Sequence, residues 1–128
     1  MSALDLDLGR CAYDQVNHLR QKHGRWGLQE DGKIAQEAFA HIIHGIKQRG
    51  LCHADNAFLS GVVENVHCGT THDPYSLIQH FIQHSDNCHR GNYMREDIDA
   101  QGLAVHTEWI ECRWRYWTVL VWRGRFRG

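Results

Sequence analysis

Apolar residues recur at helical spacing in the first half of the chain. Between positions 7 and 23 they predict a first helix that Gly24 can end, and between positions 31 and 50 a clearer stripe predicts a second helix, capped by Asp31 and ended by Gly50. The pair Asp73-Pro74 is typical of a helix start, and it predicts a third helix to about His84. A short fourth helix is expected over positions 89 to 95.

The last third of the chain changes to strand-forming residues. From Trp114 to Trp122 both alternating sets of positions are apolar, which is typical of a central strand covered on both faces, and positions 100 to 107 are its expected partner. Positions 51 to 72 show no sustained period and are expected to be irregular, with one short element at 62 to 66. Helices followed by strands predict the α+β class, as a three-layer α/β/α sandwich with a central antiparallel sheet.

The composition indicates a single globular domain that spans residues 1 to 128. The formal net charge is −1, so no nucleic-acid partner is expected. No apolar run approaches the roughly 18 residues of a transmembrane segment. The first nine residues do not resemble a signal peptide, so the chain as written is expected to be cytoplasmic, or secreted if a leader preceding Met1 was trimmed.

Cysteine and tryptophan leave several structural options open. The five Cys allow a bridge between Cys52 and Cys88 or between Cys68 and Cys112, but their number is odd and free thiols fit a cytoplasmic chain. Four of the five Trp lie between Trp109 and Trp122, where alternation predicts that most are core residues.

Three short segments carry the candidate chemistry. They are His53 after Cys52, the pair Glu64-Asn65, and the pair His89-Arg90. Two imidazoles and a carboxylate are zinc ligands that leave coordination positions open for water. The chain has 11 His, and the pair His80 and His84 could share a helix face, but a solvated surface is the favoured interpretation of that pair.

The order of these residues resembles the CAP superfamily of cysteine-rich secretory proteins, antigen 5 and plant pathogenesis-related proteins, in particular its short prokaryotic members. The resemblance covers most of the chain. After the opening helices it includes His53, the pair Glu64-Asn65 with Gly69, and the pair His89-Arg90 with Asn92. It ends on two strands, with Gly102, Ala104 and Val105 in the first, and with Arg123-Gly124 where Phe-Gly is usual in the second. The positions in the opening helices are Asn17, Arg20, Gly24, Leu28, Asp31, Ile34 and Ala38.

The resemblance implies a cleft that holds zinc or another divalent cation. His53, Glu64 and His89 match three of the four cleft residues of the family. The fourth, a Glu on the helix before the second His, has no equivalent, and Asp73, Asp86 and Glu96 are substitutes by proximity in sequence.

Three functions are compatible with these residues. We expect a CAP-like binding domain with a non-catalytic cleft and a lipid, glycan or protein ligand, as the resemblance implies. The first alternative is a zinc-dependent hydrolase in which Glu64 accepts a proton from metal-bound water. The second is an assembly subunit with a vestigial cleft, which makes its contacts through an apolar sheet edge bordered by Arg residues.

Overall fold

The computed structural model describes residues 2–46, 53–54 and 60–128. The helices are α1 (Ala3–Lys22), α2 (Gly32–His41), α4 (Pro74–Gln83) and α5 (Asn87–Tyr93), and a π-helical turn, Ile42–Ile46, follows α2. The strands are β1 (Gln29–Glu30), β2 (Val62–Thr71), β3 (Ile98–Ile110) and β4 (Arg115–Phe126), with a 3₁₀ turn, Glu111–Arg113, between the last two. None of the described helices is both long enough and apolar enough to span a membrane.

Strand β4 lies in the interior of the sheet, which explains why both of its faces are apolar. The described residues form a four-stranded sheet of order β1-β3-β4-β2, in which β4 pairs antiparallel with both β2 and β3. Strand β1 pairs parallel with β3 through two residues only, which adds a short parallel edge to the expected central antiparallel sheet. The predicted pairing of positions 100 to 107 with the last strand is confirmed.

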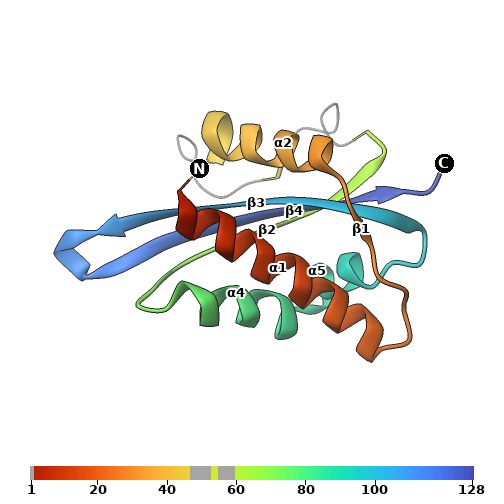
Figure 1. Ribbon diagram of the computed structural model, residues 1–128, viewed down its shortest axis with the longest axis horizontal. Helices are drawn as coiled ribbons and strands as arrows, with labels where there is room; N and C mark the ends of the chain where they lie inside the picture. Colours follow the sequence, from red (N-terminus) through yellow and green to blue (C-terminus); the bar gives the residue numbers. More distant parts are fainter. Residues whose placement is uncertain (1, 47–52, 55–59) are drawn as a thin grey trace.

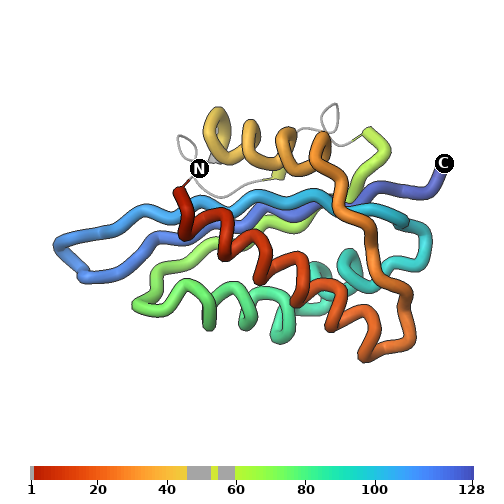
Figure 2. Tube along the Cα trace, in the orientation of Figure 1, coloured from red at the N-terminus to blue at the C-terminus, as the bar shows by residue number. Residues whose placement is uncertain are grey.

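Helices cover both faces of this sheet, as the predicted three-layer sandwich requires (Figure 1). Helix α2 lies on one face, and helices α1, α4 and α5 lie on the other. The core under α2 consists of Ala38, Ile42, Val66, Ala104, Val119 and Val121. The larger core on the other face includes Leu8, Val16, Ile78, Ile82, Leu103, Val105, Leu120 and Trp122. The hairpin of β3 and β4 extends beyond the helices at one end (Figure 2).

Helix starts follow the capping residues. Helix α1 begins at Ala3, earlier than the apolar pattern indicated, because the Ser2 hydroxyl accepts a hydrogen bond from the Asp5 amide. Asp31 and Asp73 cap α2 and α4 as predicted. The expected end of the second helix at Gly50 lies outside the described residues.

Two polar residues of α1 join it to distant segments. Asn17 bonds to both backbone groups of Leu28, with its Oδ1 accepting from the amide at 2.8 Å and its Nδ2 donating to the carbonyl at 3.2 Å. Arg20 is fully buried and donates to the carbonyls of Trp26, Tyr93 and Arg95, each at 2.8 Å. Burial lowers the pKa of this guanidinium. Asn17 and Arg20 therefore hold the scaffold together, and they lie outside the candidate site.

Strand β2 extends the short element that was expected at positions 62 to 66 and corrects the expectation of irregular backbone from there to position 71, whereas residues 51–52 and 55–59 of the same stretch lie outside the described residues. It runs for ten residues from Val62 to Thr71, and every one of them pairs with β4. The sequence of this strand does not show the usual alternation of apolar and polar residues, because three of its buried residues, Glu64, Asn65 and His67, are polar. Each of these side chains has a hydrogen-bond partner inside the protein, so their burial does not break the strand.

The described cysteines are free thiols. Cys11 and Cys68 are partly buried, and Cys88 and Cys112 are exposed. A bridge between Cys68 and Cys112 is therefore not formed. Cys52, which the sequence analysis suggested as the partner of Cys88, lies outside the described residues.

Candidate functional site

Glu64 and Arg123 form an ion pair on the face of the sheet that α2 covers. The two residues are cross-strand partners, so their side chains lie on the same face, which also carries Val66 and Val121. Glu64 Oε2 accepts a hydrogen bond from Arg123 Nε at 2.8 Å, and the two side chains are 1% and 3% exposed. Glu37 on α2 lies farther away, with its Oε2 4.0 Å from Arg123 Nη1. The charge of Glu64 is thus neutralised inside the protein.

The second oxygen of Glu64 is also occupied. Glu64 Oε1 accepts from the Ala54 amide at 2.9 Å and lies 3.2 Å from His53 Nδ1. The His53 side chain is 56% exposed, so it covers the carboxylate from the solvent side. Because both oxygens of Glu64 are engaged, the carboxylate has the role of a structural acceptor in this geometry.

The backbone carbonyl of His89 is hydrogen-bonded to Asn65, the residue that follows Glu64 in β2. The Asn65 side chain donates to the His89 carbonyl at 2.8 Å, and Asn92 donates to Asn65 Oδ1 at the same distance. Asn65 is fully buried. This pair of amides therefore fixes α5 against the outer strand β2 and sets the position of the His89 ring.

Asp86 orients the His89 side chain. Its Oδ1 accepts from the His89 amide at 3.0 Å, as the N-cap of α5, and lies 2.9 Å from His89 Nδ1. The hydrogen bond from the His89 backbone amide, and next the one from the His89 ring, hold the pKa of the Asp86 carboxyl below its usual value. A carboxylate accepts but does not donate, so Nδ1 of His89 is the donor to Asp86, and in the neutral form of the ring the lone pair is on Nε2.

His67 is the site residue that the sequence analysis missed. Its Nε2 lies 2.8 Å from the Tyr93 hydroxyl, and its ring centroid is 4.5 Å from that of His89 and 5.0 Å from that of Phe81. Burial, and next the positive charge that His89 can carry, lower the pKa of His67 to about 3. The available signal was its place two residues after Asn65, which puts both on one face of β2.

The structure distributes the three expected ligands over two faces of β2. His53 contacts Glu64 on the α2 face, whereas the ring of His89 packs on His67 on the opposite face. His53 is still near enough to contribute to the lowered pKa of His67. The expected set of His53, Glu64 and His89 is thus gathered around one sheet edge, but its side chains are not all in contact.

The two histidines have a geometry that suits metal ligation, whereas Glu64 does not. His53 and His89 each direct Nδ1 at a carboxylate, which is the arrangement that commonly orients a zinc-ligating imidazole through its other nitrogen. Glu64 does not fit as a ligand, because Arg123, Ala54 and His53 occupy its oxygens. Within residues 2–46, 53–54 and 60–128, no group of three or more His, Cys, Asp or Glu side chains is arranged to hold a metal. On the surface, His80 and His84 stack at 5.2 Å between ring centroids.

The tip of the β3 and β4 hairpin carries exposed aromatic residues. Trp109 and Trp114 are 49% and 67% exposed, and both rings pack in one cluster with Tyr116. Trp122 is fully buried, in agreement with the prediction that most of these Trp are core residues. The prediction is wrong for Trp109 and Trp114, which are exposed. The hairpin extends beyond the ends of the helices, so at its tip no described helix covers the face on which α1 and α4 lie.

Comparison with known proteins gives similarity of structure rather than of sequence. No protein-family model matches the chain, and no curated protein sequence does. An outer surface protein of Borrelia burgdorferi superimposes with a TM-score of 0.64 at 13% identity, over 94% of both chains. A cysteine-rich secretory protein of Staphylococcus aureus superimposes with a TM-score of 0.54 at 14% identity, over 94% of this chain and 40% of that one.

The second of these structures agrees with the fold that the resemblance in the sequence implies. The present chain spans less than half the length of the staphylococcal protein, and at these identities the likeness concerns the fold. The chain therefore has a CAP-like fold.

Proposed function

We propose that this CAP-like domain is a binding module whose cleft is non-catalytic. The observation that supports the proposal is the state of Glu64, which a hydrolase would need as a general base. A base must have a lone pair within reach of the attacking water. In this protein Arg123, at a position where the family resemblance has Phe, neutralises the carboxylate, and Ala54 and His53 occupy its other oxygen.

Metal binding in this proposal rests on the two histidines. In this proposal the donor atoms would be Nε2 of His53 and Nε2 of His89, whose rings lie on the two faces of the edge strand β2, so that a cation would have to bind at the edge between them. Glu64 and Asp86, next to Nδ1 of each ring, would orient the rings. Zinc or another divalent cation would then bind with moderate affinity and complete its coordination with water or with the partner. A bound cation would supply an electrophilic anchor for an anionic or carbonyl group of a lipid, glycan or protein ligand.

Calorimetry of zinc binding to metal-stripped protein tests the metal part of the proposal. Wild type is expected to bind one equivalent, and the His53→Ala/His89→Ala double variant is expected to lose it. The matched control is His80→Ala/His84→Ala, which removes two exposed histidines and should bind as wild type does. Equal binding by all three proteins, or by none, would contradict a site at His53 and His89.

Hydrolysis assays test the non-catalytic part. With zinc present, cleavage of activated esters and peptide substrates by wild type should equal that by Glu64→Gln, which keeps the size of the side chain but is not a base. A rate that depends on both zinc and Glu64 would instead support the hydrolase alternative.

The assembly alternative has its own observation, the exposed aromatic tip formed by Trp109, Trp114 and Tyr116. Arg113 and Arg115 flank this tip and are exposed. A stable oligomer that chelator leaves intact and that Trp109→Ser/Trp114→Ser dissociates would support this alternative. A monomeric wild type would count against it.

A further inference from the structure

Trp114 is the most exposed large apolar side chain among the described residues, at 67%. It lies at the tip of the β3 and β4 hairpin, where the two strands extend beyond the helices (Figure 2). Single apolar residues on a surface are normal, but Trp114 packs in one cluster with Trp109 and Tyr116. An exposed aromatic cluster on a projecting tip indicates an interaction surface.

The backbone at Trp114 is held in a conformation that tryptophan rarely adopts. Its φ of 52° and ψ of 42° lie in the left-handed region that favours glycine. The Trp114 amide donates to the Glu111 carbonyl at 3.2 Å, and its carbonyl accepts from His72 Nδ1 at 2.9 Å. Because glycine would fit this turn without strain, the turn itself does not explain the tryptophan. Strain of this kind is typical of functional positions.

The three aromatic rings of the tip are tilted against one another. Trp109 meets Trp114 at 73° and Tyr116 at 59°, with ring centroids 6.1 Å and 4.9 Å apart. The cluster therefore lacks the flat open platform on which nucleobases stack. It forms a wedge of apolar ring bodies that carry polar N–H and O–H groups. Side chains of this kind are typical of the boundary between lipid and water.

Two arginines flank Trp114 in the sequence. Arg113 and Arg115 are exposed, and within the described ranges neither guanidinium forms an ion pair or a hydrogen bond. Glu111 is the acidic residue of positions 110 to 115, so the tip carries one net positive charge. Guanidinium groups bind phosphate oxygens through paired hydrogen bonds. The free cations of the tip therefore match a partner that carries phosphate.

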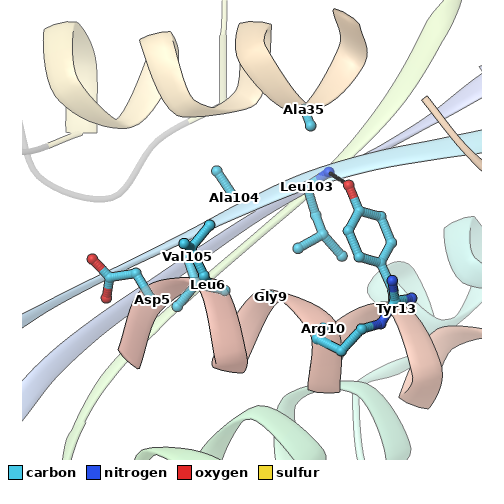
Figure 3. A pocket seen from close by; sticks show the side chains of 9 residues that line it. All are labelled: Asp5, Leu6, Gly9, Arg10, Tyr13, Ala35, Leu103, Ala104 and Val105. Atoms are coloured by element: carbon cyan, nitrogen blue, oxygen red, sulfur yellow. Dashed lines mark hydrogen bonds between the residues drawn. The ribbon is translucent and has the colours of Figure 1, made fainter. Parts of the chain in front are cut away.

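A hollow beside α1 is the concave alternative to the tip, and it is closed to large partners (Figure 3). Its volume is about 260 Å³, and the strand edge at its floor is buried, with Leu103 4% and Val105 1% exposed. Along this edge the Leu103 amide donates to the Tyr13 hydroxyl at 3.1 Å, and the Thr107 amide donates to Asp5 Oδ1 at 3.0 Å. The tip, in contrast, is accessible.

We propose that the tip of the β3 and β4 hairpin docks on the surface of a phospholipid bilayer with anionic headgroups. The rings of Trp109 and Trp114 enter between the headgroups, and Arg113 and Arg115 bind the phosphate groups around them. The whole chain has a formal net charge of −1, so no general attraction to an anionic surface exists. The binding energy therefore comes from the tip.

The tip and the cleft of His53 and His89 are independent sites. Arg123, the ion-pair partner of Glu64, lies seven residues along β4 from Tyr116. At about 3.3 Å per residue this separation is about 23 Å. Docking of the tip therefore needs no metal, and a cleft that binds no metal would leave this proposal unaffected.

Co-sedimentation of the whole chain with lipid vesicles tests the proposal. Wild type should bind vesicles of phosphatidylcholine with about one third phosphatidylglycerol at lipid concentrations up to about 1 mM. Binding to phosphatidylcholine alone should be about tenfold weaker, because the arginines lose the anionic headgroups. Arg113→Gln/Arg115→Gln should bind both kinds of vesicle equally weakly.

Trp114→Gly separates binding from folding, because glycine suits the left-handed backbone at this position. Its thermal midpoint should equal or exceed that of wild type, whereas its binding to the anionic vesicles should be about tenfold weaker. The matched control is Trp26→Phe. It replaces a tryptophan that is 46% exposed, keeps a ring beneath Arg127, and should bind as wild type does.

NMR of the indole N–H groups locates the contact. A spin-labelled lipid in small bicelles of the same composition should broaden the signals of Trp109 and Trp114, while fully buried Trp122 stays sharp. No binding by wild type, equal binding by Trp114→Gly, or broadening at other tryptophans would each overturn the proposal. Broadening of the tip signals with rising protein concentration and no lipid would also overturn it, since the tip would then contact a second copy of the chain.

Discussion

The Glu64 carboxylate and the Arg123 guanidinium face each other on paired strands and are almost completely withdrawn from solvent. A buried pair of this kind contributes little compared with an apolar pair of the same size, but breaking it is costly because one charge stays buried alone. The pair therefore fixes the geometry of the candidate site more than it stabilises the fold.

Arg123→Met is expected to destabilise the protein by about 3 to 5 kcal/mol, since Glu64 is left buried with only the Ala54 amide and His53. Urea unfolding measures the change. The double variant Glu64→Gln/Arg123→Met removes both charges and should recover part of the loss. A cost below about 1 kcal/mol for the single variant would mean that the pair is solvated in solution.

Acid is expected to destabilise the fold through His67. Its pKa is about 3 in the folded protein and 6.5 in an unfolded chain, so between these values only the unfolded state binds the proton. The contribution of neutral, buried His67 to the free energy of unfolding is fully present above pH 6.5. It is lost as the pH falls toward 3, by about 1.4 kcal/mol per pH unit well below pH 6.5.

Urea unfolding midpoints at pH 7.5 and 5.0, compared between wild type and His67→Gln, separate the effect of His67 from that of the other ten histidines. His67→Gln can keep a hydrogen bond to Tyr93 but does not titrate, so its stability should fall less between the two pH values than that of wild type. If the two proteins lose stability in parallel, His67 is not the residue responsible.

Gly102→Ala is expected to push α2 off the sheet. A Cβ at this position would lie 2.4 Å from the Ala35 backbone nitrogen and 2.5 Å from Ile34 Cβ, closer than atoms can approach. The cost should be about 3 kcal/mol, at the upper end of the range for overpacking. Gly91→Ala is the matched control, because a Cβ there meets nothing within 4 Å. Equal thermal midpoints for the two variants would show that α2 adjusts freely.

The helices and the central strand could be predicted because their signals are local. Asp31 and Asp73 cap the helices that follow them, and the apolar faces of β4 reflect helices on both sides. Strand β2 could not be predicted in the same way. Its polar residues resemble a loop in sequence, and the groups that satisfy them lie far away in the chain, at Arg123 for Glu64 and at Tyr93 for His67.

Of the residues that meet at this candidate site, the sequence analysis named His53, Glu64 and His89 but missed His67 and Arg123. Residue type and order placed His53, Glu64 and His89 together, as the CAP resemblance implies. What the sequence did not reveal is that Arg123 neutralises Glu64 and that alternation along β2 separates Glu64 from His89. Both facts depend on strand register, which follows from the whole sheet.

The side chains of Tyr13 and Asp5 also bear on the solubility of the domain. An open strand edge invites the sheets of neighbouring molecules to fuse, and that process needs several consecutive backbone groups in register. Here α1 occupies the Leu103 and Thr107 amides, and Val105 between them is 1% exposed. An edge covered in this way excludes a second sheet, so a concentrated solution of the protein should resist fibril formation unless α1 is displaced.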